Sequence, residues 1–294
     1  MNNQFIIKNP GIAKWGILAV LSLIWGSSFI LIKNGLVGFG FVEAASIRLM
    51  AAGAVFLPFG IYQANKIPKD RWPYVVLATL VGIFIPAFLF CLAQQHVQSA
   101  VAGILNALTP VFTFVFSIFL FKTSYKTNHA LGLLLGLASA GLLILERSDS
   151  AISINEYAGL IILATVLYGL NINLVKHKLH DVPATAISVT SVSLAGLLAF
   201  LFVFLPRQSH YSLSERQWWP LLALVVLGIM STGLATILYY KLLKITSALF
   251  ASTTTFLMPI VAVIWGLLDG EVFGWGHVLG IAGILTAVLL IRKG

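Results

Sequence analysis

Charged residues are scarce in this chain, and acidic residues are the rarest of them. Only 9% of the 294 residues are charged and 9 are acidic, whereas 59% are hydrophobic. The mean hydropathy is +0.99. A soluble protein of this composition would expose far more apolar surface than soluble proteins tolerate. The composition therefore excludes a water-soluble globular fold and indicates a protein of the lipid bilayer.

Disulfides and recognisable catalytic patterns are also missing. Cys91 is the only cysteine, and a thiol inside an apolar run is usually inert. No Ser/His/Asp order, Gly-rich phosphate loop or pair of intramembrane carboxylates stands in a convincing context. His177, His180 and Asp181 resemble a metal cluster, but the lysines beside them repel a cation. We expect no enzyme and neither cofactor nor metal; a membrane enzyme built on His177 and Asp181 is the less favoured alternative.

The net charge of +9 is not gathered into the single basic patch of a nucleic-acid-binding protein. Thirteen of the 18 basic residues fall in connections on the side that holds both termini. By the positive-inside rule, both termini are expected in the cytoplasm. We thus expect a multi-pass protein of the plasma membrane, or of the inner membrane of a cell with two. Its partners would be lipid and a small-molecule substrate but no nucleic acid, and a monomer is compatible with the sequence.

Apolar runs of roughly 18 to 24 residues, each long enough to cross the hydrocarbon layer as a helix, recur ten times. We therefore predict an all-α integral membrane fold with ten transmembrane helices. The predicted spans are 13–32, 41–62, 73–93, 98–121, 128–146, 156–175, 184–205, 219–241, 246–268 and 274–291.

An internal repeat organises these spans. Ile24–Lys33 (IWGSSFILIK) returns 143 positions later as Leu167–Lys176 (LYGLNINLVK), and in both copies a ring precedes a glycine and a lysine ends the run. Cys91–Ala100 and Tyr239–Ala248 match at a similar offset, and each precedes a proline in an apolar run. Such repeats should be found before any fold is named.

Five spans per repeat is an odd number, so the second repeat must enter the membrane from the side opposite to the first. The sequence thus predicts two inverted five-helix repeats, residues 1–147 and 148–294, forming one integrated membrane domain around a central cavity. Inverted repeats of this kind hold a binding site near the midplane and let one set of helices rock against the other.

The chain resembles the EamA-type proteins of the drug/metabolite transporter (DMT) superfamily. The resemblance rests on WGSSF in the first helix, on Arg48 early in the second, on the small-residue runs into Pro110 and Pro259, and on Glu271 after the ninth. It implies ten helices in two inverted repeats and a cavity lined mainly by helices 1, 3, 4, 6, 8 and 9. It also implies transport of small metabolites, often amino-acid export. One departure is Lys122, where members of the family often carry a second glutamate.

Two helix faces carry aromatic and polar residues in equivalent positions. Trp25 and Ser28 share a face of the first helix, as do Tyr168 and Asn171 in the sixth. Polar groups at this depth must face protein or water. These residues are therefore candidates to line the cavity, with rings that pack on a substrate and polar groups that orient its head. The alternative is close helix packing through the glycine that follows each ring.

Prolines within the third, fourth and ninth spans predict bends, because each removes a backbone donor. Asn106 and Thr255 each lie four residues before such a proline, beside the carbonyl that it frees. These bends are either gates with polar groups that face substrate or permanent kinks. The run Ser252–Thr255 holds too many hydroxyl groups to face lipid on all sides, and at least one is expected at the cavity.

Arg48 stands about two turns into the second helix, where an unpaired cation costs roughly 3 kcal/mol. A substrate carboxylate is one candidate partner, and Glu43, helix-end carbonyls or lipid phosphate are the more ordinary ones. Gln94 and Tyr239 lie at helix ends where an entrance is expected.

No acidic residue lies deep within a predicted helix, although proton or sodium coupling commonly uses one. We therefore expect an alternating-access exporter or facilitator of small neutral or zwitterionic metabolites, with amino acids as the favoured class. The alternative is an exporter of organic cations or drugs that uses an aromatic cage and a nearby acid such as Asp269, Glu271 or Glu43. The predicted substrate-binding residues are Trp25, Ser28, Arg48, Gln94, Asn106, Tyr168, Asn171, Tyr239, Thr254 and Thr255.

Overall fold

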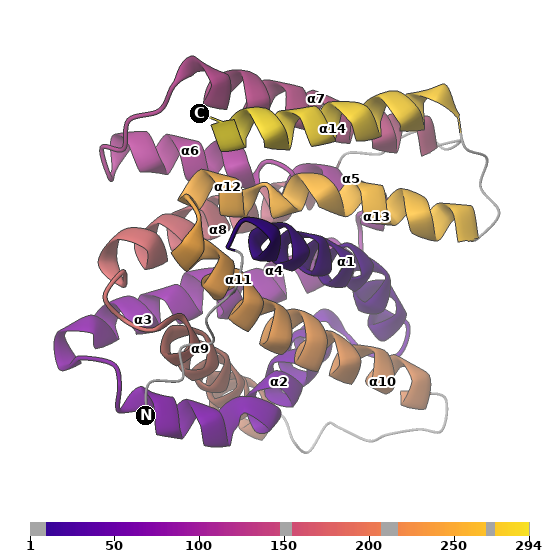
Figure 1. Ribbon diagram of the computed structural model, residues 1–294. Coiled ribbons are helices and arrows are strands. Elements are labelled where there is room, and N and C mark those ends of the chain that lie inside the picture. The colour runs from indigo at the N-terminus through magenta and orange to yellow at the C-terminus, as the bar shows by residue number, and fades with distance from the viewer. Residues whose placement is uncertain (1–9, 148–154, 207–216, 269–273, 294) are drawn as a thin grey trace.

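The computed structural model describes residues 10–147, 155–206, 217–268 and 274–293, and within them all regular structure is helical (Figure 1). Nine helical spans of this part of the chain are long and apolar enough to cross a membrane, and a tenth, shorter apolar helix covers Thr127–Leu143. The ten predicted spans are confirmed, and their bounds shift by a few residues. Glu271 and Asp269 lie outside the described residues.

The first five spans comprise α1 (Pro10–Leu36), α2 (Phe41–Ala64), the series η1 (Lys69–Arg71), α3 (Trp72–Thr79), η2 (Leu80–Phe84) and α4 (Ile85–Ala93), the pair α5 (Ser99–Asn106) and α6 (Thr109–Phe119), and α7 (Thr127–Arg147). The second five comprise α8 (Ala158–Lys178), α9 (Ala184–Ala199) with η3 (Phe200–Phe204), the series α10 (Trp218–Val226), η6 (Leu227–Leu234) and α11 (Ala235–Ile245), the pair α12 (Ala248–Ser252) and α13 (Thr254–Leu268), and α14 (Trp275–Lys293).

The fourth and ninth spans are both broken, but only the fourth breaks at its proline, and Pro259 lies inside α13. The fourth breaks between α5 and α6, just before Pro110, and the Thr109 hydroxyl donates to the Asn106 carbonyl at 2.8 Å. That carbonyl is the one that Pro110 deprives of its usual donor. The ninth span breaks at Thr253, between α12 and α13, well before Pro259. Each hydroxyl of Ser252–Thr255 donates to the carbonyl three residues earlier, so this break is held by local side-chain bonds.

The third and eighth spans are interrupted by π-helical segments, η2 and η6. Pro86 follows η2 directly, at the start of α4. No proline lies within η6 or α11. Such π-helical turns widen a helix locally and are frequent at functional sites. Both segments face the interior cavity described below.

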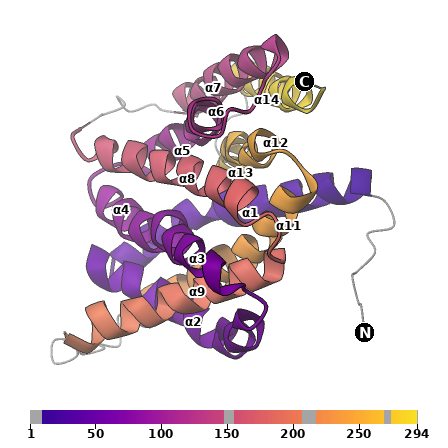
Figure 2. The same cartoon turned by 90° about the vertical axis from the view of Figure 1, so that its left-hand side faces the viewer.

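Glycines bring the two halves into close contact. Gly53 of α2 meets Gly196 of α9 so closely that a Cβ on Gly53 would stand 2.7 Å from the Gly196 Cα atom. At the opposite edge of the molecule, α7 lies beside α14 (Figures 1 and 2). There Gly132 packs on Ile291, and Gly280 packs on Leu143. Small residues at crossings allow the backbone approach on which membrane helix packing depends.

These contacts come in pairs whose equivalent residues lie 143 to 149 positions apart in the sequence. Gly26 of α1 packs on Val261 of α13, and Gly169 of α8, 143 positions after Gly26, packs on Phe112 of α6. His129 accepts a hydrogen bond from the Lys126 backbone N–H before α7, while His277 accepts one from the Gly274 N–H before α14, each at 3.1 Å. The two halves thus repeat one another in their contacts as well as in their sequences.

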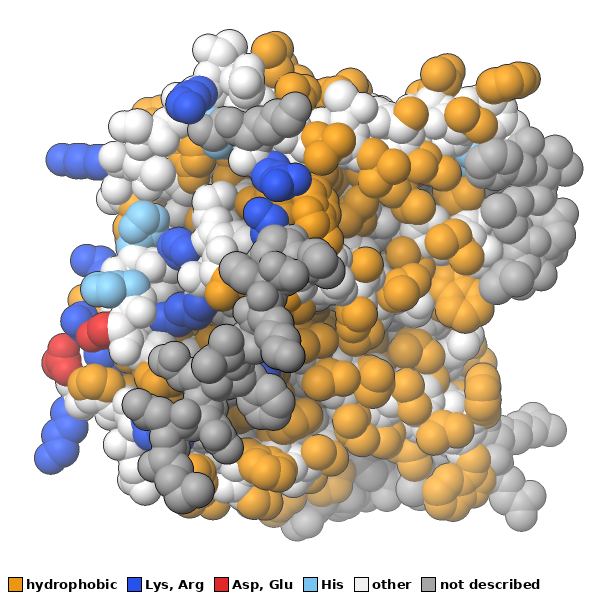
Figure 3. Space-filling model, viewed as in Figure 1, with side chains coloured by type: hydrophobic (Ala, Val, Ile, Leu, Met, Phe, Trp, Pro, Cys, Tyr) orange, Lys and Arg blue, Asp and Glu red, His pale blue; other side chains and the backbone are white. Residues whose placement is uncertain are grey.

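The described basic side chains gather toward one end of the helices, at the left of Figure 3. α1 begins at this end and α14 ends there. The two helix ends lie side by side, since the Arg292 guanidinium is 5.5 Å from the centre of the Trp15 ring. Arg71, before α3, forms an ion pair of 3.0 Å with Asp181, which follows α8. We call this the basic end of the molecule.

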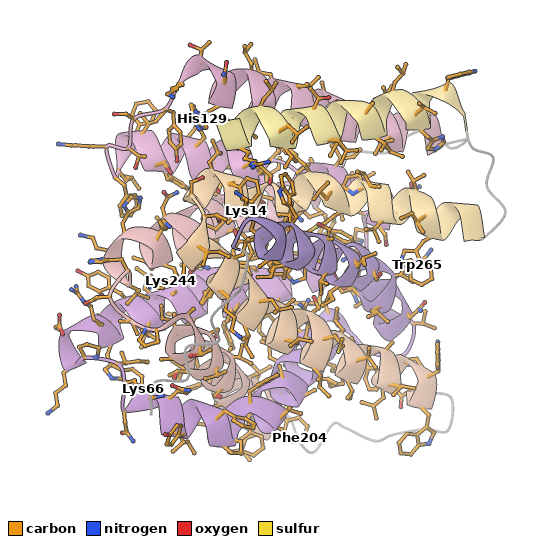
Figure 4. All side chains as sticks on the ribbon, viewed as in Figure 1. Lys14, Lys66, His129, Phe204, Lys244 and Trp265 are labelled. Carbon is orange, nitrogen blue, oxygen red and sulfur yellow. The ribbon has the colours of Figure 1, made fainter. Side chains whose placement is uncertain are left out.

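Two lysines join α8 to α11 at the basic end. Lys176 of α8 donates to the carbonyls of Leu243 and Thr246, at the end of α11. Lys244 of α11, labelled in Figure 4, donates in return to the carbonyls of residues 179 and 180, just after α8. Cations at helix C-termini satisfy unpaired carbonyls and the helix dipole. We call this arrangement the reciprocal lysine caps.

Candidate substrate cavity

A cavity of about 120 Å³ lies in the interior between the two halves. Its walls come from α1, α2, η2, α4, α5, α6, α8, η6, α11 and α13, which include all six helices that the family resemblance implies, with α2 in addition. Eight of the ten predicted site residues line it: Trp25, Ser28, Arg48, Asn106, Tyr168, Asn171, Tyr239 and Thr255. One water occupies about 30 Å³ of liquid, so the space suits a small molecule.

Arg48 is the cation of this cavity. Its Nε and Nη2 donate to the Thr232 hydroxyl of η6 at 3.2 and 3.0 Å. Glu43, expected as an ordinary partner, instead accepts the Gly40 backbone N–H at the start of α2. Among the described residues the cavity lining contains no Asp or Glu. The guanidinium therefore faces the cavity with its positive charge uncompensated by any acid of the described chain, an arrangement that favours an anionic group in the ligand.

Aromatic rings form two facing pairs, one around each of the predicted rings. Trp25 lies 5.1 Å from Tyr239, centre to centre, at a tilt of 55°. Tyr168 stacks on Phe90 at 6.0 Å. The Trp25 indole N–H donates to the carbonyl of Ser231 in η6 at 3.0 Å, which fixes the ring in place. The rings provide flat apolar surface for a substrate side chain.

Two amide oxygens in the cavity wall have no hydrogen-bond partner. The Asn106 Nδ2 donates to the Met258 sulfur at 3.2 Å, and the Asn171 Nδ2 donates to the Tyr240 hydroxyl at 3.2 Å. The Oδ1 atoms of both residues are buried and unpaired. A buried acceptor without a donor costs free energy, so these two oxygens are suited to accept hydrogen bonds from a ligand.

Gly82 of η2 leaves room for the Asn171 amide. A Cβ at this position would stand 2.3 Å from the Asn171 Nδ2 atom, so any larger residue would displace the amide. Together η2 and η6 supply Gly82, Ser231 and Thr232 to the lining. Neither segment was predicted, because helical periodicity does not distinguish a π turn from an α turn. The lining residue Thr109, which precedes Pro110, was missed although that proline signalled the bend.

Gln94 and Thr254 lie outside the cavity. The Gln94 Oε1 accepts the Ser99 hydroxyl at 3.2 Å, where the chain turns between α4 and α5. The Thr254 hydroxyl donates to the Ala251 carbonyl at 2.8 Å, so it is occupied within its own helix turn. At the break between α12 and α13, only Thr255 of the run Ser252–Thr255 lines the cavity.

Packed side chains close the space between the cavity and the basic end. The hydrophobic cluster there includes Leu18, Val175, Leu179, Leu242 and Leu243, each at most 1% exposed. Beyond it lie the reciprocal lysine caps. In this conformation the cavity is therefore shut off from the basic end.

A model of the EamA-like transporter family matches this chain twice, over residues 13–145 and 156–293. The chain belongs to the EamA-like transporter family. The two matches correspond to the two halves whose contacts repeat. The chain is accordingly a multi-pass membrane transporter and not an enzyme.

Individual relatives agree with the family. The uncharacterized inner membrane transporter YedA of Escherichia coli K12 is 27% identical over 95% of this chain and 90% of its own length. An uncharacterized transporter of Archaeoglobus fulgidus is 23% identical over 95% of this chain and 99% of its own. One solved crystal structure superposes with a TM-score of 0.70 at 19% identity, covering 94% of this chain and 95% of that one. That last likeness supports the fold alone.

Proposed function

We propose that this EamA-like protein carries small zwitterionic metabolites, amino acids above all, across the inner or plasma membrane. The single observation that carries the proposal is the guanidinium of Arg48, which faces the cavity without an acidic partner among the described residues. A substrate carboxylate would pair with it, and such charge-assisted hydrogen bonds are stronger than hydrogen bonds between neutral groups.

The rest of the lining suits the other parts of an amino acid. The unpaired Oδ1 atoms of Asn106 and Asn171 are acceptors for an ammonium group. The ring pairs around Trp25 and Tyr168 provide apolar surface for the side chain. A cavity with one cation, two free acceptors and flat rings thus complements a zwitterion with an apolar or aromatic side chain.

The aromatic-cage alternative, export of organic cations or drugs, is less well supported. Rings are present, but a cage for a cation also needs negative charge nearby. Of the acids considered for that role, Glu43 is bonded to Gly40 outside the cavity, and Asp269 and Glu271 lie outside the described residues. Arg48 would repel a bound cation.

We infer that transport proceeds by alternating access between two inverted repeats. The double family match, the paired contacts at equivalent positions of the two halves and the odd number of spans per half support the inversion. The excess of lysine and arginine at the basic end supports a cytoplasmic location for both termini. The cavity is closed toward that end, so the present conformation corresponds to an occluded or outward-facing state.

A flux assay on the purified protein in liposomes tests the proposal. Preloaded radiolabelled leucine or phenylalanine should exchange with external amino acid without an imposed pH or sodium gradient. Empty liposomes and liposomes containing the Arg48→Gln variant are the controls. Quaternary ammonium compounds should not compete. Competition by them, with no amino-acid flux, would favour the cation exporter and overturn the proposal.

A further inference from the structure

A second cavity, of about 410 Å³, lies at the basic end, apart from the substrate cavity. It is enclosed by the starts of α1 and α7, the end of α8, the turn between α11 and α12 with Phe250 of α12, and the end of α14. No lining residue is shared between the two cavities. Its size is in the range of small-ligand pockets.

The charges around this second cavity are all of one sign. Lys14, Lys176 and Arg292 line it, together with His129 and His177, and no Asp or Glu of the described chain does. Figure 4 labels two of these residues, Lys14 of α1 and His129 of α7. A cavity lined by three basic side chains and no acid of the described residues has an uncompensated positive field, which attracts an anion.

The cations are held in place by neutral groups. The Lys14 ammonium lies 5.5 Å from the centre of the Phe250 ring, and the Arg292 guanidinium lies 5.5 Å from that of Trp15. The ion pairs of the described residues join Arg71 to Asp70 and Asp181, and none uses a cation of this cavity. Positioned cations without acidic partners are the pattern of an anion site.

Hydroxyl groups complete the wall. Thr123, Ser124, Thr246 and Ser247 line the same cavity. The Thr246 hydroxyl donates to the Leu242 carbonyl at 2.7 Å, so the hydroxyl groups of Thr123, Ser124 and Ser247 are the ones that can donate to an anion's oxygens. The Ser247 hydroxyl oxygen already accepts the Phe250 backbone N–H at 3.1 Å, so its hydrogen is available to another acceptor. Several donors around a positive centre suit a tetrahedral, multiply charged oxyanion better than a single carboxylate.

We propose that this cavity binds a phosphate group, supplied by the headgroup of an anionic phospholipid of the surrounding leaflet or by a soluble phosphate. Basic pockets between transmembrane helices commonly hold anionic headgroups. The phosphate would join α1 to α14 through Lys14 and Arg292. It would therefore stabilise the basic end without contacting the transported substrate.

Thermal unfolding of the full-length protein in neutral detergent tests this. Dioleoyl phosphatidylglycerol, dioleoyl phosphatidylcholine, sodium phosphate and sodium chloride of equal ionic strength are added separately. Phosphatidylglycerol or phosphate should raise the melting temperature by about 5 °C over phosphatidylcholine and chloride. A rise with the lipid alone identifies the headgroup as the source, and a rise with sodium phosphate identifies a soluble one.

Matched charge variants locate the site. The double variant Lys14→Gln/Arg292→Gln removes two cavity cations, and Lys69→Gln/Lys241→Gln removes two exposed lysines that do not line the cavity. The first should lose at least half of the rise and the second should keep it. Equal loss in both, or no rise in the parent protein, would overturn the proposal.

Native mass spectrometry of the parent and both variants gives a readout independent of stability, since only the cavity variant should lose the bound lipid or phosphate. Because no step measures transport, failure here leaves the amino-acid proposal standing.

Discussion

The two halves of this transporter agree in their packing and differ in their polar chemistry. Gly53 and Gly196, 143 positions apart, form a close backbone contact between α2 and α9. Five residues before each stand Arg48 and Ser191, and only Arg48 lines the cavity. The Ser191 hydroxyl is buried without a hydrogen-bond partner in the described structure. Packing is thus duplicated, whereas the charge that we propose binds the substrate, that of Arg48, occurs once.

The two ends of the molecule show the same contrast. At the basic end, Arg71 before α3 pairs with Asp181 after α8. At the other end, Gln217 before α10 donates to the Gly38 carbonyl between α1 and α2 at 2.8 Å. The same connection is made by an ion pair at one end and by a neutral hydrogen bond at the other. A duplicated architecture can therefore hold an asymmetric arrangement of polar groups.

Removing the unique charge should have the largest effect. Arg48→Gln is expected to weaken amino-acid binding by about 100-fold, because hydrogen bonds to charged groups contribute about 1.5–3 kcal/mol. Ser191→Ala, at the equivalent position, should change affinity less than about twofold. Equilibrium binding of labelled amino acid to purified protein measures both. Equal losses in the two variants would mean that Arg48 acts through packing and not through its charge.

Disturbing the duplicated packing should lower stability by similar amounts in the two halves. Gly53→Ala and Gly196→Ala each place a methyl group against backbone, which is expected to cost about 1–3 kcal/mol. Gly16 and Gly159 are also 143 positions apart, and a Cβ on either meets nothing within 4 Å. Gly16→Ala and Gly159→Ala are therefore matched controls and should not destabilise the protein. Melting temperatures in detergent compare all four, and a large difference between Gly53→Ala and Gly196→Ala would contradict the symmetry of this contact.

The unpaired amides should contribute moderately to affinity. Asn106→Ala and Asn171→Ala each remove one free acceptor for the ammonium group. A hydrogen bond to a charged group contributes about 1.5–3 kcal/mol, and because the other amide can still accept, the lower limit is expected, a factor of about 10. The apparent KM for amino acid should rise by that factor while the melting temperature changes little. Gly82→Ala should resemble Asn171→Ala, since its methyl group would displace the same amide. Unchanged KM in all three would show that the ligand does not reach these oxygens.

The smallest effect concerns the two end connections. Desolvation raises the pKa of Asp181, but its backbone hydrogen bond and the Arg71 guanidinium lower that pKa by more, so the net shift is downward. A lowered pKa contributes stability that is present above the unfolded value of about 3.9 and is lost as the pH falls through the folded value. Asp181→Asn should therefore lower the melting temperature slightly from pH 6 to 8, and the difference should shrink as the pH falls below about 3.9. Gln217→Ala, at the neutral connection, should show no such pH dependence. Melting curves across this pH range check both.

Much of this architecture could be predicted from the sequence, because apolar runs of membrane length leave few alternatives. Trp25 and Tyr168 were predicted to face inward, since their equivalent positions in the repeat and their polar neighbours gave two independent signals. The π turns η2 and η6 could not be predicted, because an apolar run has the same periodicity whether its turns are α or π. Thr254 was predicted at the cavity, but only its neighbour Thr255 lines it. The hydroxyl-rich run indicated a polar segment but not which hydroxyl group faces the cavity.

The reciprocal lysine caps have a consequence for the speed of the cycle. In the proposed alternating access, exposing the cavity at the basic end by separating α8 from α11 would break the bonds of both lysines, because each is bonded to the end of the other's helix. Neither lysine can move away with its own helix while keeping its bonds. The reciprocal lysine caps would then add to the activation barrier of that step, and warming, more than extra substrate, would quicken turnover once the carrier is saturated.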